Sequence, residues 1–219
     1  MKHRKKCLTR RARAVRRLAG LGVVLILSWQ VLHVGYILPI QAIRQQEQAI
    51  GAGTTEVVSR FWEPESLSGG PLNLVYVTAN EQIVLFKQVN FTLYTGWEGN
   101  QAPVVLDCSG EKPFFAGCGA VQLEADEGEN PQSRYYLFGR VDDPSIQRIE
   151  AVITYERAGN LPAAQLALQT LREEWTVLGD AAFFCLRSES GARLGNGSGT
   201  LTAAAYDAAG NLIARQESA

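Results

Sequence analysis

After residue 72 the chain consists mainly of short runs that are either apolar or alternate between hydrophobic and polar residues, and alternation with a period of two is typical of β-strands that bury one face. The segment 146–155 shows it clearly, because Ile149, Ala151 and Ile153 alternate with mainly polar residues such as Arg148 and Glu150. Further runs of this kind, separated by turn residues, predict strands at 72–78, 82–88, 90–97, 104–108, 118–123, 134–141, 146–155, 181–187, 199–206 and 211–215.

Turn-forming residues lie between several of these runs. Ala79-Asn80-Glu81 separates the first two as a hairpin-like turn, and the sequence Asp207-Ala208-Ala209-Gly210 fits a type I turn. About ten short strands joined by regular turns predict a mainly β domain with an antiparallel, β-sandwich-like fold. One sheet covered by a single helix is the alternative.

One segment of this domain departs from the alternation. In 162–175 (PAAQLALQTLREEW), Leu168, Leu171 and Trp175 come close to helical spacing, and Pro162 suits a first helical turn. The remaining residues are mostly good helix formers. The segment therefore predicts one helix within the β domain.

An apolar segment of 21 residues, 18–38, contains no Lys, Arg, Asp or Glu. A helix of that length spans roughly 30 Å, the thickness of the hydrocarbon core of a bilayer. Its Leu, Ile and Val residues favour insertion by about 5 kcal/mol, which exceeds the opposing cost of Ser28, Gln30 and His33. The segment predicts a single transmembrane helix that contacts membrane lipid.

The flanks of this segment predict an uncleaved signal anchor with a cytoplasmic N-terminus. Its apolar region is longer than the about 7–15 residues of a cleaved signal peptide, and Ile40-Gln41-Ala42 has a bulky residue where cleavage requires a small one. Residues 1–17 carry nine Lys/Arg and no acidic residue, so the positive-inside rule places them in the cytoplasm. We therefore expect a single-pass protein of the cell membrane whose main domain is extracytoplasmic.

Charge is segregated along the chain. Nine of the 21 Lys/Arg lie in 1–17, so residues from 40 onward hold 12 basic against all 22 acidic residues, a formal charge of −10. This charge argues against nucleic acid as a partner. Residues 39–71 are polar, Gln-rich and interrupted by Gly and Pro, which predicts a stalk or linker. The folded outer domain is predicted at 72–219, long enough for one core.

Three segments carry a resemblance to known proteins: RYYLFGRVDDPSIQRIEAVI at 134–153, AAFFCL at 181–186 and AAAYDAAGNLIAR at 203–215. Together they resemble uncharacterised extracytoplasmic proteins of Gram-positive bacteria that are membrane-anchored or lipoproteins. The resemblance covers the last 85 residues or so of the chain. It implies a C-terminal extracytoplasmic β-sandwich and no particular activity.

Histidine is absent from the outer domain, since the only two are His3 and His33. This excludes Ser-His-Asp and Cys-His nucleophile systems, His-ligated zinc and imidazole acid–base catalysis there. The outer domain also lacks the phosphate-binding, dinucleotide-binding, nucleophile-elbow and Cys-x-x-Cys motifs. We therefore expect no catalytic residue, no cofactor and no metal site in it.

Three kinds of functional site have weaker support in the sequence: a carboxylate pair, a Ser-Lys dyad and a Ca²⁺ site. A carboxylate-based hydrolase needs only two acids, and its candidates are Asp142/Asp143, Glu173/Glu174 and the acidic loop 124–132. Asp142/Asp143 are explained as turn residues, Glu173/Glu174 as a solvated helix face, and the acidic loop as a contribution to solubility. A Ser-Lys dyad would have to use Lys87 or Lys112, which lack motif context, and the acidic loop lacks the spacing of a Ca²⁺ site.

The three outer cysteines lie in a compartment that permits disulfides. Cys108 and Cys118 flank one short loop, and a bridge between them would contribute roughly 2–3 kcal/mol. Two free buried thiols are the alternative for this pair. Cys185 lies in the apolar run FFCL and is expected to be a buried free thiol.

Taken together, these features predict a membrane-anchored extracytoplasmic binding or assembly module of unknown ligand. The alternative is an accessory or sensory subunit of a membrane complex, recruited by a protein partner. Gln30 and His33 are three residues apart and share one face of the predicted membrane helix, so they are the candidate contacts for such a partner.

Overall fold

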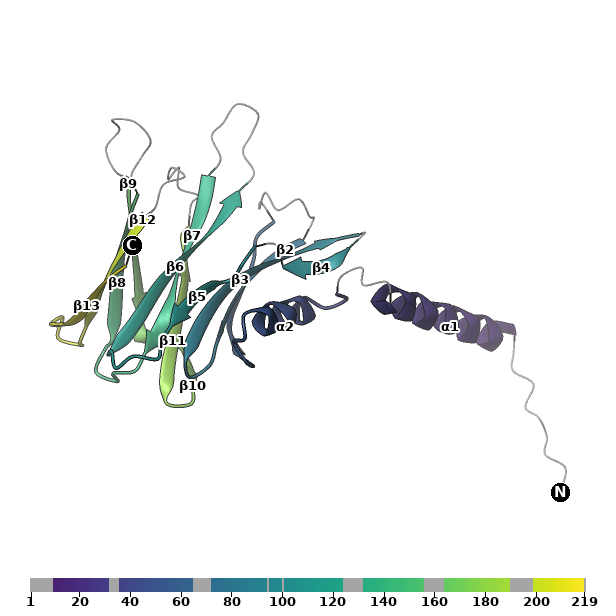
Figure 1. Ribbon diagram of the computed structural model, residues 1–219, viewed down its shortest axis with the longest axis horizontal. Coiled ribbons are helices and arrows are strands. Elements are labelled where there is room, and N and C mark those ends of the chain that lie inside the picture. The colour runs from purple at the N-terminus through teal and green to yellow at the C-terminus, as the bar shows by residue number, and fades with distance from the viewer. Residues whose placement is uncertain are drawn as a thin grey trace, which may run out of the picture.

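The structure is a computed structural model that describes residues 10–31, 36–64, 72–93, 95–99, 101–123, 132–155, 164–189 and 199–218. The body of the molecule is mainly β and antiparallel, as the sequence predicts, and its strands form three sheets. Two α-helices precede the sheets: α1 lies apart from the body and α2 lies against it (Figure 1).

Helix α1 (Arg10–Val31) begins in the basic segment and includes the first part of the predicted membrane span. Within the described residues, no helix combines the length and the apolar character needed to cross a membrane. The predicted span is wrong at its C-terminal end, where residues 36–38 belong to the body. Tyr36 and Trp97 exchange both backbone hydrogen bonds, at 3.1 and 2.8 Å, which fixes this segment on a strand.

The segment predicted as a stalk is instead part of the folded body as far as the structure describes it. Helix α2 (Pro39–Ala49) begins at a proline, and the Leu38 N–H donates to Gln41 Oε1 at 3.1 Å. Its Ala42 and Ile43 are fully buried, and burying one Ile contributes about 1.5–3 kcal/mol. The sequence predicts a short helical extension here, and the structure shows that this helix packs on the body through its one apolar face.

Sheet A holds five strands, of which β1 to β4 lie in sequence order and β5 pairs with β3 beside β4. The predicted strand 90–97 is split, because Thr92 Oγ1 accepts from the Thr95 N–H at 3.0 Å and closes a turn. The strands are β1 (Glu56–Trp62), β2 (Leu72–Ala79), β3 (Ile83–Thr92), β4 (Gly96–Gly99) and β5 (Val104–Asp107).

Sheets B and C each hold four strands, in the orders β10-β11-β7-β6 and β13-β12-β8-β9. Sheet B consists of β6 (Phe114–Leu123), β7 (Gln132–Val141), β10 (Thr176–Leu178) and β11 (Ala181–Arg187). Sheet C consists of β8 (Arg148–Tyr155), β9 (Ala164–Leu171), β12 (Gly199–Tyr206) and β13 (Leu212–Ser218). A turn forms at the predicted place, since the Gly210 N–H donates to Asp207 O at 3.1 Å and Gly210 has a φ of 83°.

The sheets stack face to face in the order A, B, C, and α2 covers the outer face of sheet A (Figure 1). Alternate residues of β7 show why sheet B lies in the middle. Tyr136 and Phe138 enter the cluster shared with sheet A, whereas Tyr135 and Leu137 enter the cluster shared with sheet C. A strand buried on both faces is apolar at every position, and this explains the run YYLF.

The helix predicted at 162–175 is wrong, because this segment forms β9 followed by the short 3₁₀ helix η1 (Arg172–Glu174). Every residue of β9 pairs with β8. Leu166 and Leu168 pack on the cluster between sheets B and C, while Gln165 and Gln169 are exposed. Pairing and burial thus override the intrinsic helix preference of this segment.

Candidate functional site

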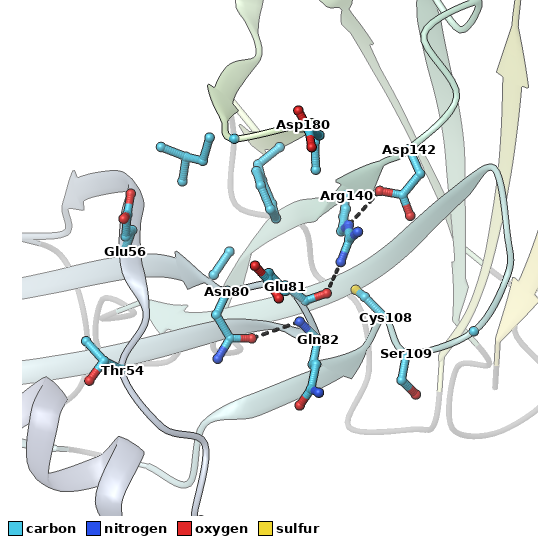
Figure 2. A pocket seen from close by; sticks show the side chains of 16 residues that line it. Thr54, Glu56, Asn80, Glu81, Gln82, Cys108, Ser109, Arg140, Asp142 and Asp180 are labelled. Atoms are coloured by element: carbon cyan, nitrogen blue, oxygen red, sulfur yellow. Dashed lines mark hydrogen bonds and ion pairs between the residues drawn. The ribbon is translucent and has the colours of Figure 1, made fainter.

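A cavity of about 1060 Å³ lies where sheets A and B meet at one end of the body. Five pieces of chain line it: the approach to β1, the β2–β3 turn, the segment after β5, the end of β7, and the β10–β11 turn with Phe183 behind it. These segments are far apart in the sequence, and Figure 2 shows their side chains around one space. The stacking of the two sheets therefore creates the site.

Acidic side chains dominate the lining of this cavity. Glu56, Glu81, Asp142 and Asp180 line it together with one basic residue, Arg140. The Arg140 guanidinium donates to Asp142 Oδ1 at 2.6 Å and to the Glu81 backbone carbonyl (Figure 2). The formal charge of the lining is −3, and its single cation is already bonded to protein groups.

The β2–β3 turn forms one wall of the cavity and is rigid because of Asn80. The Asn80 Oδ1 accepts from the Gln82 and Ile83 N–H groups at 2.9 and 3.0 Å. Its Nδ2 donates to the Ala52 carbonyl at 3.0 Å, which ties the turn to the segment before β1. The hairpin-like turn predicted at 79–81 is confirmed, and its Asn has this local structural role.

Cys108 lines the cavity but is not poised for nucleophilic attack. The residue is 4% exposed, and its thiol donates to the Leu106 carbonyl at 3.6 Å. Burial raises the pKa of the Cys108 thiol to about 12, so the thiolate is scarce at neutral pH.

The carboxylate pair proposed from sequence does not form. Asp142 lines the cavity, whereas Asp143 accepts from the Ser145 Oγ and N–H groups at 2.7 and 2.8 Å. The Ser145 hydrogen bonds lower the pKa of Asp143, as expected for a carboxylate in a turn. The turn interpretation of Asp143 is confirmed.

The other candidates lie away from the cavity. Glu174 accepts from Thr170 Oγ1 at 3.0 Å on η1, and the neighbouring Glu173 is exposed. Lys112 is exposed, with its ammonium 5.8 Å from the Phe115 ring centroid. Most of the acidic loop, 124–131, lies outside the described residues. Among the residues that are described, no group of three His, Cys, Asp or Glu side chains could hold a metal ion.

The predicted bridge between Cys108 and Cys118 has no support in the structure. Cys108 belongs to the cluster between sheets A and B, and Cys118 packs on the cluster between sheets B and C. The two thiols donate to different backbone carbonyls, Leu106 O and Gly119 O. The bridge therefore stays a prediction. Cys185 is a free thiol of intermediate exposure rather than a fully buried residue, and desolvation raises its pKa.

The proposed membrane contacts cannot be placed. Gln30 lies within α1, and nothing is described of its side chain. His33 lies outside the described residues.

Sequence reasoning missed a buried ion-pair network between α2 and sheet A. The Lys87 ammonium donates to Glu47 Oε1 at 2.6 Å, and these side chains are 0% and 2% exposed. Arg44 donates to Glu47 Oε2 at 2.6 Å, and Thr55 Oγ1 donates to Glu47 Oε1. We call Arg44, Glu47, Thr55 and Lys87 the α2 network. The signal was present: Lys87 is a charged residue inside the apolar run IVLFKQV.

Opposing effects set the charge states within the α2 network. Burial raises the pKa of Glu47, but hydrogen bonds from Lys87, Thr55 and Arg44 together lower it below its ordinary value. Burial lowers the pKa of Lys87, and its bond to Glu47 opposes this. The network attaches α2 to the centre of sheet A.

A second buried carboxylate, Glu63, joins the end of β1 to sheet B. Glu63 is 0% exposed and accepts from Arg134, from the Tyr136 hydroxyl and from Arg187, the last at 3.1 Å. Burial and the neighbouring Glu63 raise the pKa of Tyr136. The guanidinium groups of Arg134 and Arg187 balance the charge of the buried Glu63 carboxylate, so we assign this cluster a structural role.

Comparisons with protein-family models, with curated proteins and with solved structures find no match. The resemblance to extracytoplasmic proteins of Gram-positive bacteria stays a prediction.

Proposed function

We propose that this chain is a single-pass membrane protein that displays its three-sheet body outside the cytoplasm as a binding or assembly module. The exposure of α1 carries the proposal. Between Leu18 and Leu27, seven large apolar side chains are 53–69% exposed. A helix that is apolar on all faces and not packed into a core is stable in a lipid environment and unfavourable in water.

The charge pattern supports the orientation. Arg16 and Arg17 in α1 precede these apolar side chains, and the other basic residues of 1–17 lie on the same side. Cytoplasmic flanks of membrane helices carry an excess of Lys and Arg. Residues 36–218 would then face outward with their excess of acidic residues.

The test of this proposal is a topology experiment on intact cells. Externally added protease should remove a tag placed after Ala219 and spare a tag placed before Met1, and alkaline carbonate should leave the chain in the membrane. As a matched control, the five Arg of α1 are replaced by Gln, which should weaken the orientation preference. A chain extracted by carbonate, or an N-terminal tag cut from outside, would contradict the proposal.

The acidic cavity is the binding site that we propose for the module. Its lining favours a ligand group that carries a positive charge, such as an amine or guanidinium, because Arg140 is already bonded to Asp142 and to the Glu81 carbonyl. The full chain should be cross-linked in native membranes and its partners compared with those of Glu81→Lys/Asp180→Lys. The control is Glu217→Lys on β13, because the Glu217 side chain is 70% exposed. Equal capture by all three chains would exclude the cavity as the site.

A carboxylate-based hydrolase is the second candidate, because Asp142 shares the cavity with three further acids. Asp142→Asn removes a carboxylate and keeps the side-chain shape. Turnover of a glycan panel by the wild-type chain, abolished by this substitution without loss of fold, would establish the hydrolase. An inert wild-type chain would favour the binding module.

A further inference from the structure

The described body exposes large apolar side chains next to the point where the chain leaves α1. Leu93, in the β3–β4 turn, is 75% exposed and is the most exposed large hydrophobic residue described. Leu38 is 54% exposed and Ile37 is 38% exposed. We call Ile37, Leu38 and Leu93 the juxtamembrane surface.

Strand pairing places these three residues at one end of sheet A. Tyr36 pairs antiparallel with Trp97 of β4, and Trp97 pairs antiparallel with Phe91 of β3. The residues after Tyr36 therefore run in the same direction as β3, toward the turn that holds Leu93. The Phe91 and Trp97 rings, on the paired strands β3 and β4, contact each other with centroids 5.4 Å apart.

Chain length keeps this surface close to the end of α1. Five Cα–Cα steps separate Val31 from Tyr36, and at about 3.8 Å each they reach at most about 19 Å. Figure 1 shows α1 beyond the side of the body where α2 and β4 lie. If α1 enters the bilayer, this end of the body lies at the bilayer surface.

The length of the apolar helix gives a second argument. From Leu18 to Val31, α1 supplies about 21 Å of apolar length, less than the roughly 30 Å of the hydrocarbon core. A short span is accommodated by thinning of the bilayer or by adjacent groups that enter the interface. The apolar stretch of the sequence continues to Leu38, and Leu38 lies on the body. The surface that faces lipid can therefore continue from α1 onto the adjoining end of the body.

We propose that the juxtamembrane surface rests in the interface of the outer leaflet, between headgroups and acyl chains. This rests on the proposed anchoring by α1. Exposed Leu and Ile side chains suit the apolar boundary of the interface, and none of Tyr36–Leu38 or Leu93 carries a charge. The contact is apolar, so it requires no anionic lipid.

The test uses the full chain in phosphatidylcholine vesicles, with Cys7→Ser in every variant. The chain without an added cysteine is labelled in parallel as the blank for Cys108, Cys118 and Cys185, of which only Cys108 is buried. A fluorescent label is attached at Leu93→Cys or at Leu212→Cys. Leu212 is a matched control because it is 57% exposed and begins β13, on the side of the body opposite α1 (Figure 1). Nitroxide-labelled lipids should quench the label at 93 and spare the label at 212, and iodide should do the reverse.

The outcomes separate this inference from the proposed anchoring. A chain that floats with vesicles after carbonate washing but shows equal lipid quenching at 93 and 212 retains its anchor and overturns the juxtamembrane surface. A chain that does not float overturns both proposals. Quenching at 93 that appears only with anionic lipid, or disappears in high salt, also overturns the inference. If the label at 93 disturbs the fold by circular dichroism, Leu38→Cys replaces it.

Discussion

The ion pair between Glu47 and Lys87 offers a direct test of what holds α2 on sheet A. Both side chains are almost fully buried, and the ammonium and carboxylate are 2.6 Å apart. Lys87→Met and Glu47→Leu each leave one charge behind, whereas the double variant removes both. The three variants form a double-mutant cycle.

The two single variants should lower the free energy of unfolding by different amounts. Removal of one partner from a buried ion pair destabilises a protein by about 3–5 kcal/mol. After Lys87→Met, Glu47 keeps the hydrogen bonds from Arg44 and Thr55, so we expect the low end of that range. After Glu47→Leu, the buried ammonium loses the carboxylate that it contacts, so we expect the high end. Burial already lowers the pKa of Lys87. In the Glu47→Leu variant the lysine can therefore lose its proton and become neutral, which limits the loss of stability.

The double variant should recover most of the loss. Replacement of a buried ion pair by apolar side chains of similar volume is often neutral or stabilising, so we expect stability within about 2 kcal/mol of the wild type. In the double variant Arg44 loses its carboxylate partner but keeps its hydrogen bond to the Thr55 carbonyl at 2.7 Å, and its side chain is 37% exposed, so water can solvate it. The Thr55 hydroxyl also loses its acceptor, which accounts for part of the remaining cost. Lys112→Met is the control, because this exposed lysine should cost no more than about 0.5 kcal/mol.

The α2 network also predicts a dependence on pH. The folded pKa of Glu47 lies below its ordinary value of 4.5, so its stabilisation is present above that value and is lost as pH falls through the folded pKa. The wild type should therefore lose more stability on acidification than the double variant.

Urea denaturation of the full chain in detergent, followed by far-ultraviolet circular dichroism, measures these free energies. A cost below about 1 kcal/mol for both single variants would contradict the buried pairing, given the magnitude expected for such a pair. A double variant that is as unstable as the sum of the single variants would show that the two side chains do not interact.

Three further predictions use the same unfolding assay or simple chemistry. Gly139→Ala should destabilise by at least about 3 kcal/mol, because its Cβ would lie 2.0 Å from the Phe115 carbonyl oxygen. Gln216→Ala should cost about 1–3 kcal/mol, because the Gln216 amide makes two hydrogen bonds, both 3.0 Å, with the buried backbone of Ala116. Native Cys108 should react with iodoacetamide at pH 8 about a thousandfold more slowly than a free thiol, since its pKa rises from 9.0 to about 12.

Each of these has a control and a contradicting result. Gly110→Ala should be neutral, since its Cβ meets Phe115 no closer than 4.0 Å, and equal effects at both glycines would refute the clash. Gln216→Glu should also lose stability, because a carboxylate cannot donate to the Ala116 carbonyl; an unchanged midpoint would refute that bond. Rapid alkylation of Cys108 in the native chain would contradict its burial, and peptide mapping that finds it joined to Cys118 would confirm the sequence-based bridge.

The strands could be predicted because each buries one face, or both, in a repeating pattern. The bounds of β11 and β12 agree with those predicted from alternation and turn residues. The error at β9 shows the limit of propensity, since its Ala, Leu and Gln residues favour helices but pair with β8. The number of sheets could not be deduced, because the alternation within a strand does not say which sheet covers its buried face.

The candidate site was less accessible to sequence reasoning. Asp142 was singled out beside Asp143, yet its neighbours in the cavity are Glu81 and Asp180, which come from other turns. Such a juxtaposition depends on how sheets A and B stack. Lys87 has no motif around it, but a charge within a buried strand indicates a buried partner.

The central position of sheet B determines how the body can come apart. Because β7 contributes to two of the hydrophobic clusters, separation of either outer layer exposes one face of the same strand. The layers are therefore coupled into a single cooperative unit, and amide protons of β7 should exchange with solvent only through global opening. A chain shortened before β12 would expose the face of sheet B that packs on sheet C, and this would destabilise β7, the strand that carries Arg140 at the cavity.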